Sequence, residues 1–393
     1  MPFPPFVPAL ALTLVLSWGS LFYAFALMAR PVQAELQAGA TAVMGAYSFG
    51  LLVWGLATGV VGAVLQRRGG RAVMGAGSLL AGLAFIGLGE VNSIGGLYLA
   101  WGTLGAAMAL TLYEPAFAVI VQACPGERRR FITALTLAGG LASAVFWPLT
   151  DQLVAQVGWR ATALTYGLMH LGICAPLHAL LLPRAATVPA APPPTAAQAA
   201  ALPRPRALLL LGIAFAANGF VTAALAVHVI PLLESRGVAP GAAVALATCI
   251  GPMQVAGRTL EFISGGALDA RRLGLITLAL IMLALSALWL AAWAPLLCGV
   301  FVISYGAGLG LMTIVRATTP LALFGPARYA ALSGTLGMPA LLARAAGPIG
   351  ATWLLDRLSG PGALLLALLA IAACAAGAFA QAWAAGESID KQS

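Results

Sequence analysis

The sequence predicts an all-α membrane protein with twelve transmembrane helices in two pseudo-symmetric six-helix bundles. Three observations lead to this fold class: an extreme apolar composition, apolar stretches of membrane-spanning length, and a repeat on either side of a proline-rich segment. Of the 393 residues, 61% are hydrophobic and only 8% are charged, whereas a soluble domain is about a quarter charged. The composition therefore excludes a soluble globular protein.

Apolar stretches recur along nearly the whole chain, and a helix needs about 20 residues to cross the hydrocarbon core of a bilayer. The strict alternation of a membrane β-barrel strand is missing. No positive charge precedes the first stretch, which favours a helix over a signal peptide. We predict spans at residues 9–29, 41–65, 72–90, 95–122, 131–153, 160–182, 207–233, 241–268, 273–292, 295–318, 328–354 and 361–385.

The net charge of +9 reflects membrane orientation. Under the twelve-span prediction, most Lys and Arg residues fall on one side, and the opposite side has Arg30, Arg160, Arg236 and Arg357. Positive charge marks the cytoplasmic side, so both termini are expected there. This pattern does not favour a nucleic-acid partner.

The five cysteines are scattered, without CxxC or Cys/His spacing. They are expected to be small apolar residues and not metal ligands. Neither a nucleophilic triad nor a phosphate-binding loop with its lysine is recognisable, so we expect no cofactor and no enzyme activity.

A Pro/Ala-rich segment divides the chain. Residues 184–206 have basic ends and no apolar periodicity, which is typical of a linker. The predicted organisation is an N-terminal bundle at 1–183, a cytoplasmic linker at 184–206, a C-terminal bundle at 207–385 and a cytoplasmic tail at 386–393.

The two halves repeat two motifs. GAVLQRRGGR, from Gly62, corresponds to GGALDARR, from Gly265, and LTLYEPAF, from Leu110, corresponds to LMTIVRAT, from Leu311. Each motif in the first pair follows the second span of its half. Parallel repeats of this kind are typical of secondary transporters.

The first of these loops resembles the signature GxxxDRxGRR of the major facilitator superfamily. Gln66 replaces the usual acid, which the second half keeps. The resemblance implies the major facilitator fold, secondary transport without a cofactor, and a gating role for this loop. The matching positions are Gly62, Arg67, Gly69, Arg71 and Asp269.

Within the superfamily, the chain resembles bacterial relatives of the monocarboxylate porters. The basic loop and small-residue helix of ERRRFITALTLAGGLASAVFWPL, from Glu127, carry part of this likeness. The family's eighth helix has an acid and an arginine four residues apart, and here the positions hold Gln254 and Arg258. The resemblance implies a small carboxylate substrate and a bacterial inner membrane, whereas coupling through the missing acid is not implied.

Charged residues within the predicted spans are the main candidates for a site, because a charge in the bilayer is costly and usually faces a cavity. Arg258 lies eleven residues before Asp269, hence about 16 Å along a continuous helix. Glu261 lies at i+3 from Arg258 and is expected to pair with it. The pair would either hold helices in register or release Arg258 to bind an anion, and Glu261 is also a candidate for proton coupling.

Glu114 precedes Pro115, which permits a helix kink. In the repeat Glu114 falls opposite Arg316, so the two would form either a permanent salt bridge or a pair that breaks during transport. A buried carboxylate can load and release a proton, which makes Glu114 the main candidate for proton coupling. Arg344, among prolines and glycines of the eleventh span, is either a second anion contact or is neutralised by backbone carbonyls.

Polar residues elsewhere in the spans are weaker candidates. His228 could shuttle protons, although a lone membrane histidine is more often a packing residue, as we expect for His170 and His178. Polar contacts to a substrate are predicted for Gln254, Tyr23, Asn218 and Tyr305.

These features predict a secondary transporter of a small organic anion, driven by an ion or proton gradient and working by alternating access. Its expected partners are the anionic substrate, protons and the lipid bilayer, and we expect a monomer. Efflux of drugs or other amphipathic compounds is an alternative, since an apolar cavity with one acid would suffice. A sensor that binds a small ligand without moving it is an alternative of another class.

Overall fold

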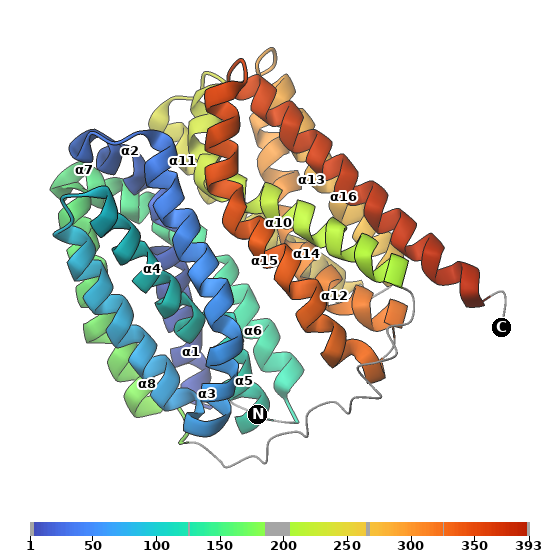
Figure 1. Cartoon of the computed structure of the whole chain (residues 1–393), viewed down its shortest axis with the longest axis horizontal. Helices are drawn as coiled ribbons and strands as arrows, with labels where there is room; N and C mark the ends of the chain where they lie inside the picture. Colours follow the sequence, from blue (N-terminus) through green and yellow to red (C-terminus); the bar gives the residue numbers. More distant parts are fainter. Residues whose placement is uncertain (1–3, 125, 185–204, 265–267, 325, 391–393) are drawn as a thin grey trace. The chain divides into compact units, whose positions relative to one another are not determined.

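The computed structural model describes residues 4–124, 126–184, 205–264, 268–324 and 326–390, and it is helical apart from short connections (Figure 1). The chain divides into two compact units, Met1–Ala190 and Ala191–Ser393, and each is described by itself. Most of the predicted linker, 184–206, lies outside the described residues, as does the end of the predicted tail, 391–393.

Unit 1 contains two π-helical turns, η1 and η2, within its helices. Its elements are α1 (Phe6–Ser17), η1 (Trp18–Tyr23), α2 (Phe25–Leu36), α3 (Ala40–Gly89), α4 (Ile94–Thr111), α5 (Tyr113–Ala123), α6 (Arg128–Gly140), α7 (Ala142–Met169), η2 (His170–Cys174) and α8 (Ala175–Leu181). The helices of unit 2 are α10 (Pro205–Glu234), α11 (Pro240–Thr248), α12 (Ile250–Ile263), α13 (Ala270–Leu290), α14 (Leu297–Phe324), α15 (Pro326–Arg357) and α16 (Pro361–Asp390).

Helices cover most of each predicted span within the described residues, although several boundaries differ. Among the described residues, eight helical stretches are long and apolar enough to cross a membrane, and two of them, Ala40–Gly89 and Arg130–Leu181, are about twice the usual length. Each of these two contains a sharp turn at a glycine with positive φ, Gly69 at 75° and Gly158 at 78°. A side chain would be strained there, so glycine lets one helix end and the next begin without a loop.

The fourth and eighth predicted spans are both interrupted. The fourth has the kink expected at Pro115, whereas the eighth was expected to be a continuous helix, and this was wrong. The fourth span breaks after Thr111, where α4 ends, and the eighth breaks after Thr248, where α11 ends. Pro115 and Pro252 lie one helical turn beyond these residues and have no N–H to donate to their carbonyls. The eleventh span, by contrast, lies within the single helix α15.

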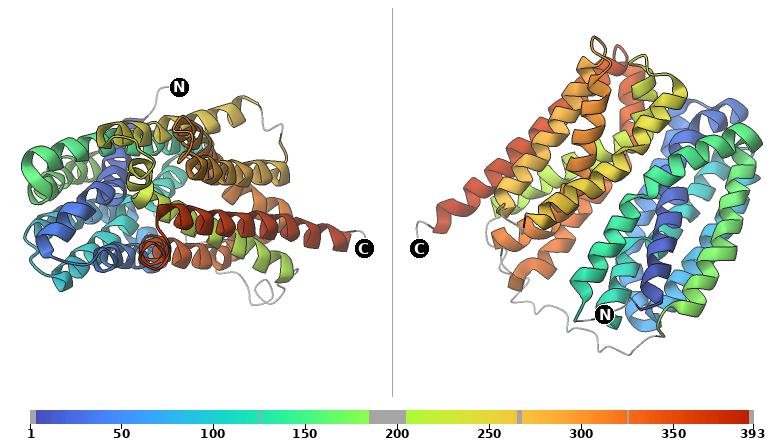
Figure 2. Two further views of the ribbon diagram at one scale, coloured as in Figure 1. Left: turned by 90° about the horizontal axis from the view of Figure 1, so that it is seen from above. Right: turned by 180° about the vertical axis from the view of Figure 1, so that it is seen from behind.

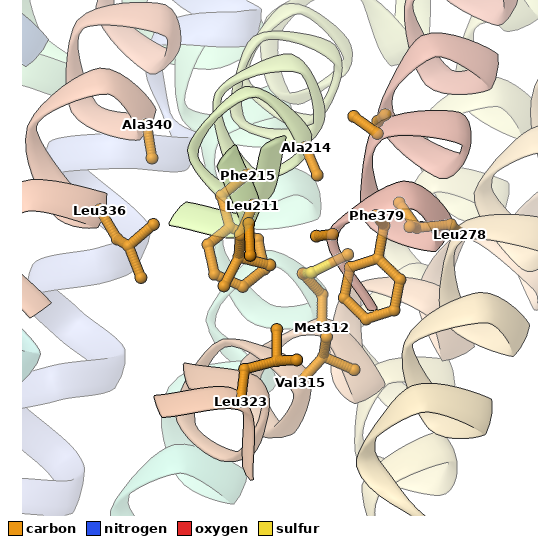
Figure 3. Close-up of a cluster of buried hydrophobic side chains, with 14 of the residues drawn as sticks. Leu211, Ala214, Phe215, Leu278, Met312, Val315, Leu323, Leu336, Ala340 and Phe379 are labelled. Atoms are coloured by element: carbon orange, nitrogen blue, oxygen red, sulfur yellow. The ribbon is translucent and has the colours of Figure 1, made fainter. Parts of the chain in front are cut away.

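The core of unit 2 joins α10, α13, α14, α15 and α16 (Figure 3). Phe379 of α16 points between α13 and α14, and a Cβ at Gly274 of α13 would collide with its ring. Figure 2 shows the long helix α16 running beside α13, with which it is in contact. This packing fixes α10 and α14, which carry several of the polar residues of the candidate site.

Arg160 joins three segments at one end of unit 1. Its Nε donates to Oε1 of Glu35 on α2 at 2.6 Å, and its terminal nitrogens donate to the carbonyls of Gly89 at 2.6 Å and Val91 at 2.8 Å. Trp159 donates to the other oxygen of Glu35 at 2.5 Å. The Arg160 side chain thus connects α7, on which it lies, to α2 and to the end of α3.

We expect Arg160→Gln to destabilise unit 1 by about 2 kcal/mol, because several charge-assisted hydrogen bonds are lost together. The apparent melting temperature of the detergent-purified protein measures this. Arg130→Gln is the control, since Arg130 is exposed and its ion pair with Glu127 is of the kind that contributes less than about 1 kcal/mol. Equal melting temperatures of the two variants would show that the Arg160 contacts do not stabilise the fold.

Candidate functional site

Glycines let α12 and α14 cross closely in unit 2. A Cβ at Gly257 would lie 2.9 Å from the carbonyl oxygen of Ala307, and one at Gly306 would lie 2.8 Å from that of Ile250. Small residues allow helix backbones to approach in this way. The approach brings a backbone carbonyl of α14, that of Gly310, within reach of the arginine that follows Gly257.

Arg258 is buried at this crossing. Its side chain is 8% exposed, and its Nε donates to the carbonyl of Gly310 at 3.2 Å. The predicted ion pair between Arg258 and Glu261, both of them described residues, is not formed, because the guanidinium reaches towards α14 while Glu261 is only half-buried on α12. The helix also ends at Ile263, so only about 8 Å of helix follows Arg258 instead of the expected 16 Å.

Two buried amides lie in the same unit as Arg258. Gln254, one turn before Arg258 on α12, and Asn218 on α10 are each 5% exposed. Among the described residues, Nε2 of Gln254 and Oδ1 of Asn218 have no hydrogen-bond partner. A buried polar atom without a partner costs about 1–3 kcal/mol unless a water or ligand satisfies it. These atoms are therefore candidate ligand contacts.

Tyr305 and Arg316 connect α14 to α10. The Tyr305 hydroxyl donates to the carbonyl of Thr222 at 3.3 Å. The Arg316 guanidinium lies 5.9 Å from the ring centre of Phe215, a cation–π contact. Both predicted site residues thus contact the helix that carries Asn218. Glu114 and Arg316 belong to different units, and their pairing stays a prediction.

His228 bridges α10 and α15. Its Nδ1 lies 2.9 Å from the carbonyl of Ala224, and its Nε2 lies 3.0 Å from Oγ1 of Thr352. With both ring nitrogens engaged, the geometry favours a packing role over the predicted proton coupling. Arg344 is half-buried on α15, one turn before Gly347, which packs against the backbone of Phe220 on α10.

In unit 1, Glu114 lines a cavity of about 240 Å³ between α3 and α5. Thr58, Gln66 and Gln122 supply its other polar side chains. Gln66 is the residue that replaces the acid of the loop motif, so the cavity has a single carboxylate among the residues described. The predicted kink is present just before Glu114, where Leu112 has extended backbone. A carboxylate in such a cavity is accessible to protons and water.

An aromatic cluster in unit 1 was missed as a group. Trp18 of η1 contacts the rings of Trp54 at 5.7 Å and Tyr113 at 5.0 Å between centroids. Tyr23, the one predicted contact from this turn, packs on Trp147 at 5.4 Å. The spacing of aromatics in SWGSLFY was visible, but the π-helical turn that orients them had no sequence signal.

The loop motif combines a turn with helix capping. Gly69 makes the turn with φ of 75°, and Arg71 donates to the carbonyl of Leu180 at 2.6 Å. Gly62 and Arg67 are exposed. In unit 2, Asp269 caps α13 by accepting a 2.8 Å hydrogen bond from the backbone N–H of Arg272, a role that sequence reasoning missed.

His170 and His178 are buried, as expected of packing residues. His170 Nε2 lies 2.9 Å from Oγ of Ser20, and His178 lies 2.9 Å from the hydroxyls of both Ser78 and Thr13. These bonds join α1 and η1 to α3, η2 and α8. The packing interpretation of both histidines is confirmed.

Comparisons with known proteins agree with this architecture. The family model described as Major Facilitator Superfamily matches residues 9–348. Human monocarboxylate transporter 11 is 32% identical over 207 residues, which are 51% of this chain and 43% of that protein. The match thus spans less than half the length of this curated relative.

Solved structures show the same fold. A mutant of the nucleoside transporter NupG aligns with a TM-score of 0.77 at 14% identity, covering 96% of this chain and 98% of that one. A bacterial homologue of the human lysosomal transporter Spinster, inward-facing and unoccupied, aligns with a TM-score of 0.69 at 17% identity, covering 99% of both chains. With the family match over most of its length, the chain belongs to the major facilitator superfamily and is a multi-pass membrane transporter, not an enzyme.

Proposed function

We propose that this transporter moves a small organic anion, a carboxylate, by alternating access. The observation that carries the proposal is Arg258, buried in unit 2 with Gln254 one turn away on the same helix. An arginine fork binds a carboxylate through two parallel hydrogen bonds, and an amide can complete the contact. The likeness to a protein named monocarboxylate transporter supports the same substrate class.

Arg316 and Arg344 are proposed as further substrate contacts, with Tyr23, Asn218 and Tyr305. Asn218 is the best supported of these, because its buried Oδ1 has no partner among the described residues. A bound carboxylic acid, or a hydroxyl beside the carboxylate, would donate to that oxygen. We thus expect substrates that carry a hydroxyl next to the carboxylate to bind more tightly than those without one.

We also propose that transport is coupled to protons through Glu114, with Glu261 as a second acid. Glu114 is the single carboxylate among the described residues that line the cavity of about 240 Å³, which supports it over the other membrane residues as the proton-coupling site. Gln66 leaves Glu114 without a neighbouring acid in the described lining of the cavity.

The proposed setting is a bacterial cytoplasmic membrane with both termini inside and a monomeric chain. The predicted bundles, 1–183 and 207–385, would move relative to each other about the linker at 184–206, with the loop motif as a gate. The distribution of arginines supports this orientation.

Efflux of amphipathic compounds is a second candidate, favoured by the aromatic cluster of Trp18, Trp54 and Tyr113. Aromatic faces bind apolar and cationic groups. Competition separates the two candidates, since lipophilic cations would inhibit an efflux protein and carboxylates would inhibit an anion porter. A sensor would bind its ligand but show no exchange in liposomes.

Arg258→Gln should lower uptake of labelled small carboxylates into liposomes by about ten- to hundredfold, the equivalent of a charged hydrogen bond. Arg258→Lys should recover only part of the loss, because an ammonium cannot form the fork. Arg357→Gln is the control, since Arg357 is exposed beside Trp353. Uptake by a folded Arg258→Gln at the wild-type rate would make Arg258 a structural residue.

Glu114→Gln should abolish the response of uptake to an imposed pH gradient while leaving exchange of substrate between the two sides of the liposome. The amide keeps the shape and polarity of the side chain but cannot carry the proton. Glu90→Gln, at the exposed end of α3, is the matched control. If Glu114→Gln still accumulates substrate when the outside is acidified, the coupling residue is another one.

A further inference from the structure

A groove of about 690 Å³ lies in unit 1, and none of its lining residues belongs to the proposed substrate or proton sites. One wall is the second half of α3, and the other is η2 and α8; α3 and α8 are in contact, as Figure 1 shows. Arg68, Arg71 and Arg184 line one end, and the rest of the lining is apolar. The groove is therefore amphipathic along its length.

The arginine end of the groove has hydrogen-bond donors without a partner among the described residues. Arg71 gives one terminal nitrogen to the carbonyl of Leu180 at 2.6 Å, which holds the guanidinium in place, while its Nε is buried without a partner among the described residues. Arg68 and Arg184 are exposed. No described carboxylate forms an ion pair with any of the three. The end of the groove thus has a positive charge that the described part of the chain does not compensate.

The apolar part results from small residues at helical spacing. Ala72, Gly75 and Leu79 follow Arg71 on one face of α3, and Ala175 and Ala179 face them from α8. A Cβ at Gly75 would meet nothing within 4 Å, which shows that the space beside this glycine is open.

The groove also lies on a side of the unit with exposed large apolar side chains. Leu79 is 51% exposed and Leu180 is 72% exposed. In a membrane protein, such surfaces contact acyl chains, since no water covers them within the hydrocarbon region. The apolar part therefore opens towards lipid.

We propose that this groove binds an anionic glycerophospholipid from the surrounding bilayer. The phosphate and headgroup would lie on Arg68, Arg71 and Arg184, and an acyl chain would lie over Ala72 and Gly75. Basic pockets between membrane helices favour anionic headgroups, and arginine binds phosphate through paired donors. A zwitterionic lipid would bring its own positive charge close to these arginines and is expected to bind more weakly.

The bound lipid would have a structural consequence. Arg71 belongs to the loop motif at the turn between the two halves of α3, and it already contacts α8 through Leu180. A phosphate at this point would join the turn at Gly69 to the end of the sixth span near Arg184. The proposal does not depend on the identity of the transported substrate.

The test uses the full chain in detergent and counts bound lipids by native mass spectrometry, with dioleoyl phosphatidylglycerol and dioleoyl phosphatidylcholine as probes. We expect wild type to retain phosphatidylglycerol preferentially. Arg68→Gln combined with Arg71→Gln should weaken its binding by about five-fold per arginine. Arg130→Gln, which removes a charge of the same unit outside the groove, should leave binding unchanged.

Gly75→Leu tests the apolar half without changing charge. Leucine would fill the open space, and it favours a helix more than glycine does, so the variant should fold while phosphatidylglycerol binding falls at least as far as for the double variant. Gly87→Leu is its control, because Gly87 also faces open space on α3 but lies outside the groove.

Three results would overturn the proposal. The first is equal retention of the two lipids by wild type, and the second is phosphatidylglycerol binding by Gly75→Leu at the wild-type level. The third is displacement of phosphatidylglycerol by millimolar inorganic phosphate, which would identify a free-anion site instead. If the double arginine variant fails to fold, Gly75→Leu decides the outcome by itself.

Discussion

α12 and α14 cross closely only because Gly257, Gly306 and Gly310 have no side chains, and the burial of Arg258 depends on that crossing. A guanidinium in an apolar unit needs acceptors, and a helix normally uses its carbonyls within itself. Here the carbonyl of Gly310 accepts a hydrogen bond from Arg258 across the crossing. A carbonyl has no formal charge, so this contact does not neutralise the guanidinium.

The two units offer different chemistry around their polar residues. Unit 2 has the buried arginine and two amides with unused atoms, whereas unit 1 has a carboxylate in a cavity and a cluster of aromatic rings. If the substrate is an anion, its charge would be recognised by unit 2 and the proton by unit 1. Such a division would link the protonation of Glu114 to substrate movement through the relative motion of the units.

Much of the fold could be predicted from the sequence, because hydropathy and helix length determine the spans almost directly. The turn at Gly69 lay in a recognised motif, and the kink before Glu114 followed from Pro115. The break after Thr248 was missed, although Pro252 was visible, because prolines are also tolerated within membrane helices such as α14. The Arg258–Glu261 pair was predicted wrongly, since i,i+3 spacing says which residues are adjacent on a helix but not which neighbouring helix offers a nearer acceptor. The lipid groove depends on α3 and α8 packing together, which no local pattern encodes.

The function proposed for this chain is the transport of small carboxylates across a membrane. Counterflow tests it most directly: proteoliposomes loaded with an unlabelled carboxylate are diluted into the labelled compound, so that entry requires exchange through the protein and no energy source. Transient accumulation of label, inhibited by other carboxylates and not by lipophilic cations, is the result that the proposed function predicts. Binding without exchange, or inhibition by lipophilic cations alone, would contradict it.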